Sequence, residues 1–283
     1  MTVSGRDLTD FQPIAAIPRA EMPNLDGCES MNKLFSVLLS ISFVFPSFAA
    51  QYYDGSSAYA STFPTPISIN PDDGTVSLWV YSSLPFTAGN SHLFLRSYDL
   101  SAGSVFDVYA FTDGNIYGGF YNGLSFTDGR VIINSITAGL TQNEWHHIAL
   151  TWVNGGDTDL WVDGSIKGTA TFVSGSRWDP AGGDGINLGL YGTAGYTGYI
   201  DDVRIYRRKL RKQEIINLYL SRTRLVITDD LTAWWKLDDG ADNQTCGPSG
   251  AVKDISGNGN TLFCSATGSV YPTWQASRWI SYP

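Results

Sequence analysis

Paired carboxylates are the first chemistry to look for, because cleaving a sugar bond with retention needs two of them about 5 to 5.5 Å apart. Beyond residue 50 the glutamates are Glu144, before a predicted strand, and Glu214, in a predicted helix. Asp157 and Asp159 are closer together, but they flank a glycine-rich turn, where aspartate commonly bonds to the backbone. No E-x-D-x-E string is present. This pattern favours a protein that is not an enzyme.

The histidines offer no better catalytic site. His146 and His147 are adjacent in a predicted strand, so their side chains point to opposite faces and cannot chelate one metal together. His92 has no obvious partner in the sequence. Zinc binding and nucleophilic catalysis have no support here, and we expect packed or hydrogen-bonded strand histidines.

The elements that would hold these residues are short strands. The 283 residues include 30 Gly, 15 Tyr, 14 Phe and 9 Trp, a profile typical of strands joined by glycine-rich turns. Predicted strands from residue 75 onward read TVSLWVY, HLFLRSY, VFDVYAF, EWHHIALTW, TDLWVDG, INLGLY and YIDDVRIY. Their spacing predicts a two-sheet sandwich. Apolar residues recurring on one face predict a short helix over residues 210–220.

Charge narrows the classes of partner. The formal net charge of −9 argues against nucleic-acid binding, which depends on attraction to phosphates. Within this acidic chain, basic residues gather in one stretch. They are Arg204, Arg207, Arg208, Lys209, Arg211, Lys212, Arg222 and Arg224. A solvated helix face and linker would explain them, and contact with an acidic glycan or an anionic surface is the alternative.

An apolar segment precedes the predicted strands. Residues 31–50 carry a single basic residue, a short apolar run and small residues at the end, which is the layout of a secretory signal peptide. The run is too short to span a bilayer. Cleavage after Ala49 or Ala50 would leave a secreted or cell-surface chain that starts near Gln51 and has no transmembrane segment. We interpret residues 1–30 as a non-native or disordered upstream extension; a cytoplasmic tail on an uncleaved anchor is the alternative.

Removal of this leader would leave two cysteines. Cys28 would be lost, and Cys246 and Cys264 would remain. Because an exported protein folds under oxidising conditions, we predict a disulfide between them. Such a bond would stabilise the fold by about 3 kcal/mol. Two separate buried thiols are the alternative.

Four ordered motifs resemble a known family. They are YYDGSSAYAS (52–61), EWHHIALTW (144–152), LWVDG (160–164) and GYIDDVRIYRRKLRKQEI (198–215). In this order they resemble the laminin-G-like, concanavalin A-like jelly roll over residues 51–220. The resemblance implies an all-β fold of two antiparallel sheets with one short C-terminal helix. The family usually opens that helix with a Ser or Thr cap, whereas Arg211 stands here, so one cap worth about 1 kcal/mol is missing.

The family's opening strand comes last in this chain. LTAWWKLDDG (231–240) resembles it, but follows the helix after a linker, residues 221–230. The segment ends at Pro283, about where Gln51 would continue. We interpret residues 231–283 as strands that complete the jelly roll of residues 51–220, which is a circular permutation. A truncated second repeat, or exchange of these strands with a neighbouring molecule, are the alternatives.

The resemblance also implies a metal. Related glucan-active jelly rolls place a calcium-binding aspartate at the position of Asp201. Strand alternation groups Asp201 with Val203 and Ile205, where a carboxylate needs a partner. The alternative partner is a salt bridge or a turn hydrogen bond. Nearby oxygen donors suit calcium. The predicted ligands of a structural calcium ion are Asp201, Asp202, Asp254 and Asn258.

Aromatic residues suggest where a ligand binds. We predict that the strand tryptophans belong to the core; they are Trp79, Trp145, Trp152 and Trp161. Aromatics in glycine-rich segments are harder to bury, and flat rings beside polar groups suit sugars. The predicted ligand-binding residues are Trp178, Asp179, Tyr191 and Tyr196.

The function expected from the resemblance is recognition. Relatives on this fold bind glycans in many cases and proteins in others. We expect a secreted, non-catalytic, lectin-like module that binds carbohydrate or a cell-surface or matrix glycoconjugate, with structural calcium. The alternative is a protein–protein adhesion or assembly module that works through the strands of residues 231–283.

Overall fold

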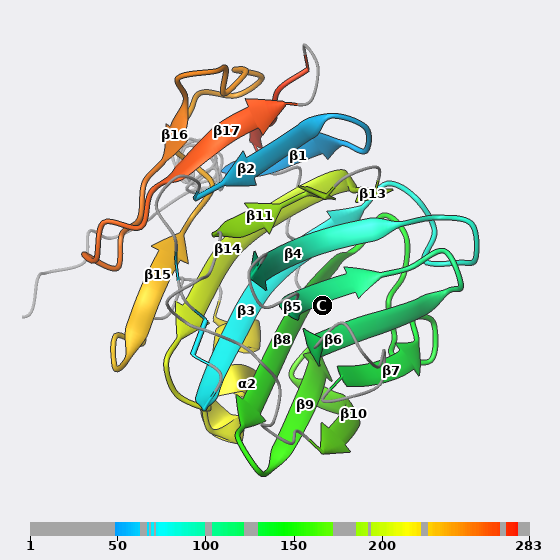
Figure 1. Cartoon of the computed structure of the whole chain (residues 1–283). Helices are drawn as coiled ribbons and strands as arrows, with labels where there is room; N and C mark the ends of the chain where they lie inside the picture. Colours follow the sequence, from blue (N-terminus) through cyan, green and yellow to red (C-terminus); the bar gives the residue numbers. More distant parts are fainter. Residues whose placement is uncertain are drawn as a thin grey trace, which may run out of the picture. The chain divides into compact units, whose positions relative to one another are not determined.

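Two antiparallel sheets that face each other form the fold (Figure 1). The computed structural model describes residues 49–62, 67, 69–70, 72–99, 104–121, 130–171, 185–191, 194–221, 226–266 and 270–276, all within the unit Ser47–Pro283. Sheet A has the order β10 (Ser165–Thr171), β9 (Asp157–Val162), β8 (Trp145–Val153), β3 (Asp73–Ser82), β14 (Thr197–Tyr206), β1 (Ala49–Asp54) and β18 (Thr273–Ala276), and β15 (Leu231–Trp235) also pairs with β14.

Sheet B has the order β16 (Ala251–Val252), β17 (Leu262–Ala266), β2 (Ala58–Ser61), β11 (Ile186–Leu188), β4 (His92–Asp99), β5 (Ser104–Ala110), β6 (Asn115–Tyr121) and β7 (Arg130–Asn134). A small hairpin joins β12 (Leu190–Tyr191) to β13 (Ala194–Gly195). With the short helix α2 (Lys212–Leu220), this arrangement confirms the predicted antiparallel jelly-roll sandwich.

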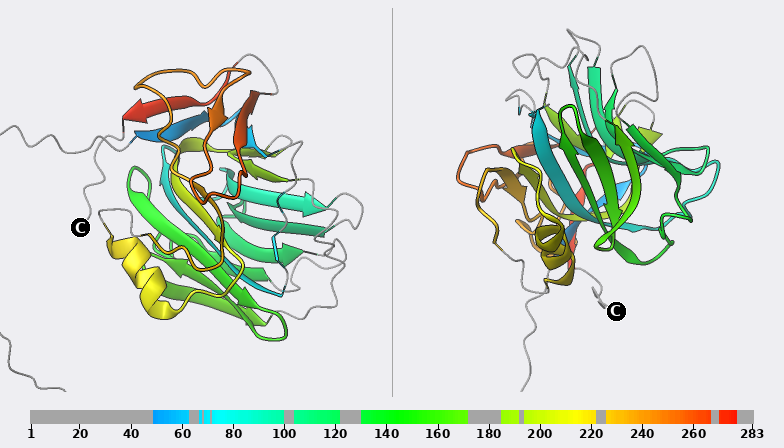
Figure 2. Two further views of the ribbon diagram at one scale, coloured as in Figure 1. Left: turned by 90° about the vertical axis from the view of Figure 1, so that its left-hand side faces the viewer. Right: turned by 90° about the horizontal axis from the view of Figure 1, so that it is seen from below.

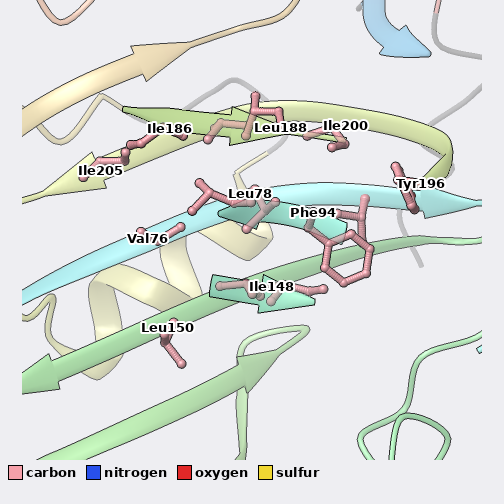
Figure 3. Close-up of a cluster of buried hydrophobic side chains, with 14 of the residues drawn as sticks. Val76, Leu78, Phe94, Ile148, Leu150, Ile186, Leu188, Tyr196, Ile200 and Ile205 are labelled. Carbon is pink, nitrogen blue, oxygen red and sulfur yellow. The ribbon is translucent and has the colours of Figure 1, made fainter. Parts of the chain in front are cut away.

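The core lies between the two sheets (Figure 3). Alternate residues of β3 and β8, such as Val76 and Leu150, point from sheet A toward Phe94, Ile186 and Leu188 of sheet B. All five are completely buried. Burying one such side chain stabilises the fold by about 1.5 to 3 kcal/mol, so the alternation of these strands fixes which face of each sheet is inside.

The strand tryptophans divide between the core and the surface. Trp79, Trp152 and Trp161 are buried, as predicted. Trp152 also donates its indole N–H to the Asn70 carbonyl at 2.9 Å, which satisfies its polar end inside the fold. Trp145 is only half-buried, so its assignment to the core was wrong.

Helix α2 covers part of the outer face of sheet A (Figure 2, left, yellow). Its Ile215 and Leu218 pack with Ala149 and Trp161, which point away from sheet B. At the helix start, the Glu214 carboxylate accepts a hydrogen bond from the backbone N–H of Arg211 at 2.8 Å. The residue at that cap position, an arginine, makes no side-chain cap bond, because a guanidinium has no acceptor. The predicted absence of one cap is therefore confirmed.

The last strands of the chain lie in the same two sheets as the first (Figure 1, orange and red beside blue). β1 pairs with residues 197–200 of β14, and β15 pairs with residues 203–206 of the same strand. β18 pairs with β1, and β17 pairs with β2. Residues 231–276 therefore contribute to both sheets. The evolutionary interpretation as a circular permutation, and exchange with a neighbouring molecule, stay predictions.

The predicted cleavage position lies at the start of β1. Ala49 and Ala50 are paired with Ala276 and Gln275 of β18, so a cut after Ala50 would remove two paired residues from the strand. The rest of the predicted signal peptide lies outside the described residues, and its cleavage stays a prediction. Among the described residues, no helix has the length and apolar character that crossing a membrane requires.

The predicted disulfide between Cys246 and Cys264 is present, with Cα atoms 5.9 Å apart and a sequence separation of 18. Reduction is expected to lower the free energy of unfolding by about 3 kcal/mol, because the open loop gains conformational entropy in the unfolded chain. Urea denaturation with and without dithiothreitol measures this difference. The matched control is the double variant Cys246→Ala, Cys264→Ala, which should be insensitive to the reductant. An equal effect of reductant on both proteins would contradict the prediction.

Candidate functional site

A row of polar residues crosses the outer face of sheet B, the face turned away from sheet A. The register between β2, β11, β4, β5, β6 and β7 aligns Ser61, Asn187, Arg96, Asp107, Gly119 and Arg130. Their chain neighbours Phe106 and Val108 point into the core instead. Side chains alternate between the two faces of a strand, so burial of one set places the polar set on the outer face.

A buried ion pair occupies one end of this row. Arg130 Nη2 donates to Asp107 Oδ2 at 2.5 Å, and both side chains are almost fully buried. The residue that separates them in the sheet is Gly119 (φ 133°), which has no side chain. Burial raises the pKa of Asp107, while the charges of Arg130 and Arg96 act in the opposite direction.

Beside this row, aromatic rings form a surface that we call the tyrosine platform, made of Tyr109, Phe111 and Tyr117. The rings of Tyr109 and Tyr117 are stacked with centroids 5.0 Å apart and planes 13° apart. Phe111 meets Tyr109 edge-on at 5.8 Å and is 42% exposed. The Arg130 guanidinium lies 5.6 Å from the Tyr109 ring centre, a cation–π contact.

Two polar residues, Arg130 and Asp113, hold the platform in place. Tyr117 donates its hydroxyl hydrogen to Asp113 Oδ2 at 2.5 Å. Burial and this hydrogen bond raise the pKa of Tyr117 to about 12, so its hydroxyl stays protonated at neutral pH. Because Arg130 contacts one tyrosine and Asp113 the other, the stacked pair is fixed in position next to polar groups.

The four residues predicted to bind a ligand are not brought together within the described part of the chain. Trp178 and Asp179 lie outside the described residues, and Tyr191 belongs to β12 with a side chain that is also outside them. Tyr196 is completely buried, so its prediction as a surface residue was wrong. Its ring packs edge-on against Phe94 at 5.2 Å, and its hydroxyl donates to the Tyr199 carbonyl at 3.2 Å. A satisfied hydroxyl removes the penalty for burying this end.

The aspartates of β14 are engaged by protein partners. Asp202 accepts two hydrogen bonds from Arg204, at 3.0 and 2.9 Å, and one from the Trp234 indole at 2.6 Å. Asp201 accepts the backbone N–H of Asp202 at 2.8 Å. The predicted grouping of Asp201 with Val203 was wrong, because a β-bulge at this point, with Asp202 at φ 49°, breaks the alternation.

The remaining two predicted calcium ligands organise a turn. Asp254 accepts the backbone N–H groups of Trp234, Ser256 and Asn260 at 2.8 to 3.0 Å. Asn258 directs its amide N–H groups, not its oxygen, to the carbonyls of residues 231 and 232. Among the described residues, no three acidic, histidine or cysteine side chains form a group that could hold a metal. The structure therefore shows these four residues in hydrogen bonds within the protein, and calcium binding stays a prediction from the resemblance.

One member of the basic cluster and the strand histidines make internal contacts. Arg204 is buried and stacks on Trp234 at 4.2 Å, so the prediction of a solvated face was wrong for this residue. Arg208 and Lys209 pair with acidic side chains and remain partly exposed. His146 binds Asp163, whereas His147 binds Ser77 on the other face of β8, which confirms that the two side chains point to opposite faces and are hydrogen-bonded.

Comparison with known proteins decides the family. Residues 54–216, more than half of the chain, match the family model of the concanavalin A-like lectin/glucanases superfamily. The chain belongs to this superfamily. No curated protein matches the chain, and the likeness to individual proteins comes from solved structures.

Two solved structures illustrate the shared fold. A provisionally assigned carbohydrate-binding protein from Bacteroides ovatus is 16% identical, with a TM-score of 0.54, and the match covers 81% of this chain and 60% of that protein. The chain thus spans about 60% of the length of the Bacteroides protein. A heptameric SAP-like pentraxin from Limulus polyphemus is 14% identical, with a TM-score of 0.50, over 79% of this chain and 97% of the pentraxin. At this identity the likeness shows the fold alone.

The tyrosine platform was missed at the level of sequence. The strand VFDVYAF was recognised, and its alternation already separates Asp107 and Tyr109 from the apolar positions. What the sequence did not provide was the register that brings Tyr117 and Arg130 beside them. The sequence signal that could have identified Asp107 and Tyr109 is that they are polar positions in a strand that is otherwise apolar.

Proposed function

We propose that this protein is a non-catalytic module that binds carbohydrate on the outer face of sheet B. The observation that carries the proposal is the stacked pair of Tyr109 and Tyr117, fixed by Arg130 and Asp113. Flat aromatic surfaces with a polar edge suit sugar rings, which have apolar faces and a rim of hydroxyls. Asn187 lies in the same polar row as Asp107 and carries an amide that suits such a rim.

The state of the glutamates supports binding without catalysis. The hydrogen bonds from Arg208 lower the pKa of Glu214 to about 2, so this carboxylate stays ionised near neutral pH and cannot supply a proton as a general acid. Glu144 bonds to the hydroxyl of Thr141. Glu214 is therefore not prepared for the acid role that sugar cleavage needs.

Similar structures agree with this proposal in kind. The Bacteroides ovatus protein carries a carbohydrate-binding assignment of its own. Because its identity to this chain is low, the proposal rests on the platform and not on that likeness. Secretion and a structural calcium ion are further parts of the hypothesis that rest on the sequence.

The alternative function, adhesion or assembly, has one observation in its favour. β15, β17 and β18 are far along the chain but supply pairs to β14, β2 and β1. An exchange of these strands between two molecules would keep every pair and link the molecules. Sedimentation of the protein over a range of concentrations would reveal such a linkage as an increase in mass.

Binding to a broad glycan array, first with calcium and then with a chelator, tests the proposed function. Tyr117→Ala is expected to weaken the binding of any selected glycan about 3- to 10-fold, because one stacking partner is lost. Tyr117→Phe keeps the ring but loses the bond to Asp113, and its binding should lie between that of Tyr117→Ala and that of the original protein. A blank array with the folded protein, or equal binding by Tyr117→Ala, would contradict the proposal. Loss of binding after addition of the chelator would show that the binding depends on calcium.

A further inference from the structure

One short sequence motif has no part in the core or in the tyrosine platform. Asn243, Gln244 and Thr245 form an Asn-x-Thr triplet, and no other Asn-x-Ser or Asn-x-Thr triplet occurs in the 283 residues. In exported proteins this triplet is the acceptor for N-linked glycosylation, provided that the middle residue is not proline. Because so short a motif also arises by chance, its structural setting decides whether it is usable.

The triplet lies in an exposed turn between β15 and β16. The Gln244 N–H donates to the Ala241 carbonyl at 2.9 Å and closes the turn. Asn243 is the third residue of this turn, with φ 59°, a left-handed conformation that asparagine tolerates better than most residues. Residues 241–245 are all exposed. An acceptor must enter the active site of a modifying enzyme, and a turn at the surface meets this requirement.

The side chains of the triplet that glycosylation uses are not needed by the fold. Among the described residues, neither the Asn243 amide nor the Thr245 hydroxyl makes a hydrogen bond within the protein. This differs from Asn258, whose amide donates to two backbone carbonyls at 2.8 and 3.0 Å. The Asn243 nitrogen can therefore be modified without the loss of a bond that holds the structure together.

The backbone of the triplet is attached to the edge of sheet A. Thr245 is bridged to Thr273 of β18, and the Gln244 carbonyl accepts a hydrogen bond from the Trp274 N–H at 2.9 Å. The next residue, Cys246, forms the disulfide. These contacts hold the loop in place while its side chains stay exposed. A disulfide is also typical of exported proteins, in which the acceptor motif is used.

The triplet is at the opposite side of the sandwich from the tyrosine platform. Its loop leads into β16, the first strand of sheet B, whereas Tyr109 and Tyr117 lie on β5 and β6, the sixth and seventh strands. Figure 1 shows β16 in orange at one end of this sheet and β5 and β6 toward the other. Five strand spacings separate β16 from β5, which is roughly 24 Å. A glycan on Asn243 would therefore leave the platform accessible.

We propose that Asn243 is an N-glycosylation site of this protein. The inference rests on the export that residues 31–50 predict and is independent of the tyrosine platform. The donor is an oligosaccharide linked to a lipid diphosphate, and the catalyst is an oligosaccharyltransferase of the secretory pathway. The Asn243 side-chain nitrogen forms a bond to the first sugar carbon and loses a proton. The bond between that carbon and the diphosphate breaks, and the lipid diphosphate leaves with the electron pair.

The test is export of the full chain from a eukaryotic cell line, with its own residues 31–50, followed by digestion with peptide N-glycosidase. Digestion is expected to increase the electrophoretic mobility of the secreted protein in a single step. The enzyme also converts the modified asparagine to aspartate, and mass spectrometry of the peptides should locate this change at position 243.

Three variants isolate the motif. Thr245→Ala should abolish the mobility shift, because the motif loses its hydroxyl. Thr245→Ser is the matched control, since it keeps a hydroxyl, and it should retain the shift. Asn243→Gly removes the acceptor but keeps the turn, because glycine readily adopts positive φ, and it should also abolish the shift. Thermal melting verifies that each variant is folded.

Several outcomes would overturn the inference. A secreted protein whose mobility is unchanged by the enzyme would show that Asn243 is not modified, and a shift that persists in Thr245→Ala would place the glycan elsewhere. A chain that stays inside the cell would remove the export on which the inference rests. If Asn243 carries no glycan but Tyr117→Ala weakens binding on the glycan array, this inference fails while the proposed function stands.

Discussion

Replacing Trp235 with Ala is expected to lower the free energy of unfolding by about 3 to 5 kcal/mol, the usual cost of emptying a large aromatic site in a core. Trp235 is completely buried between the sheets. It is paired with Val203 of β14, and its indole N–H donates to the Asn260 carbonyl at 2.6 Å. The substitution therefore leaves a cavity and removes the donor of this hydrogen bond. Urea denaturation followed by circular dichroism measures the change.

The matched control is Val226→Ala, at a position that is 60% exposed and should change stability by less than about 0.5 kcal/mol. The comparison also tests the relation between the two parts of the chain. If Trp235→Ala leaves the unfolding transition unchanged, residues 231–283 do not share the core of residues 51–220. The interpretation as a circular permutation would then be wrong.

Acid is expected to destabilise this protein strongly between pH 6.5 and pH 4. Burial lowers the pKa of His147 to about 4 and that of His92 to about 4. In the unfolded chain these groups titrate near 6.5. As pH falls below 6.5, the unfolded state therefore binds protons that the folded state does not. Each histidine removes up to about 3 kcal/mol of stability by pH 4, and this stability is fully present above pH 6.5.

The surroundings of His147 suggest the variant that isolates this effect. Its Nε2 exchanges a hydrogen bond with the Ser77 hydroxyl at 2.8 Å. His147→Gln can keep a bond to Ser77 but cannot take up a proton. Its free energy of unfolding, measured from pH 7 to pH 4, should fall about half as steeply as that of the original protein. An unchanged slope would show that other groups cause the acid sensitivity.

The fold could be predicted from sequence because each strand carries its own signal. Alternation in strands such as EWHHIALTW, with glycine-rich turns between them, was sufficient for the sandwich, and the two cysteines that remain after the predicted leader were sufficient for the disulfide. Two errors arose where the local pattern is broken by the backbone. Asp202 enters a left-handed conformation in a bulge, and no residue type requires a bulge there. Tyr196 lies in a glycine-rich segment but is buried. Its hydroxyl can be buried because it donates a hydrogen bond to the Tyr199 carbonyl.

The candidate site could not be predicted because it depends on pairing between distant strands. Arg130 and Asp107 are 23 positions apart, and only the register of β5, β6 and β7 aligns them. The same holds for Tyr52 and Trp145. They are far apart in the sequence, but the pairing of β1, β14, β3 and β8 aligns them in one row across sheet A. A side-chain period of two tells which residues share a face of one strand, not which strands are neighbours.

The pairing of β1 with β18 has a mechanical consequence. Ala49 lies opposite Ala276, so the first residue of β1 and the last residue of β18 share one rung of sheet A. A force that pulls these two residues apart would load this rung first and then the next, and would open the antiparallel pair one rung at a time. Strands pulled in shear share the load over all their hydrogen bonds, but this geometry does not. Because β18 is at the edge of sheet A, it would separate from β1 before the inner strands of the sheet separate.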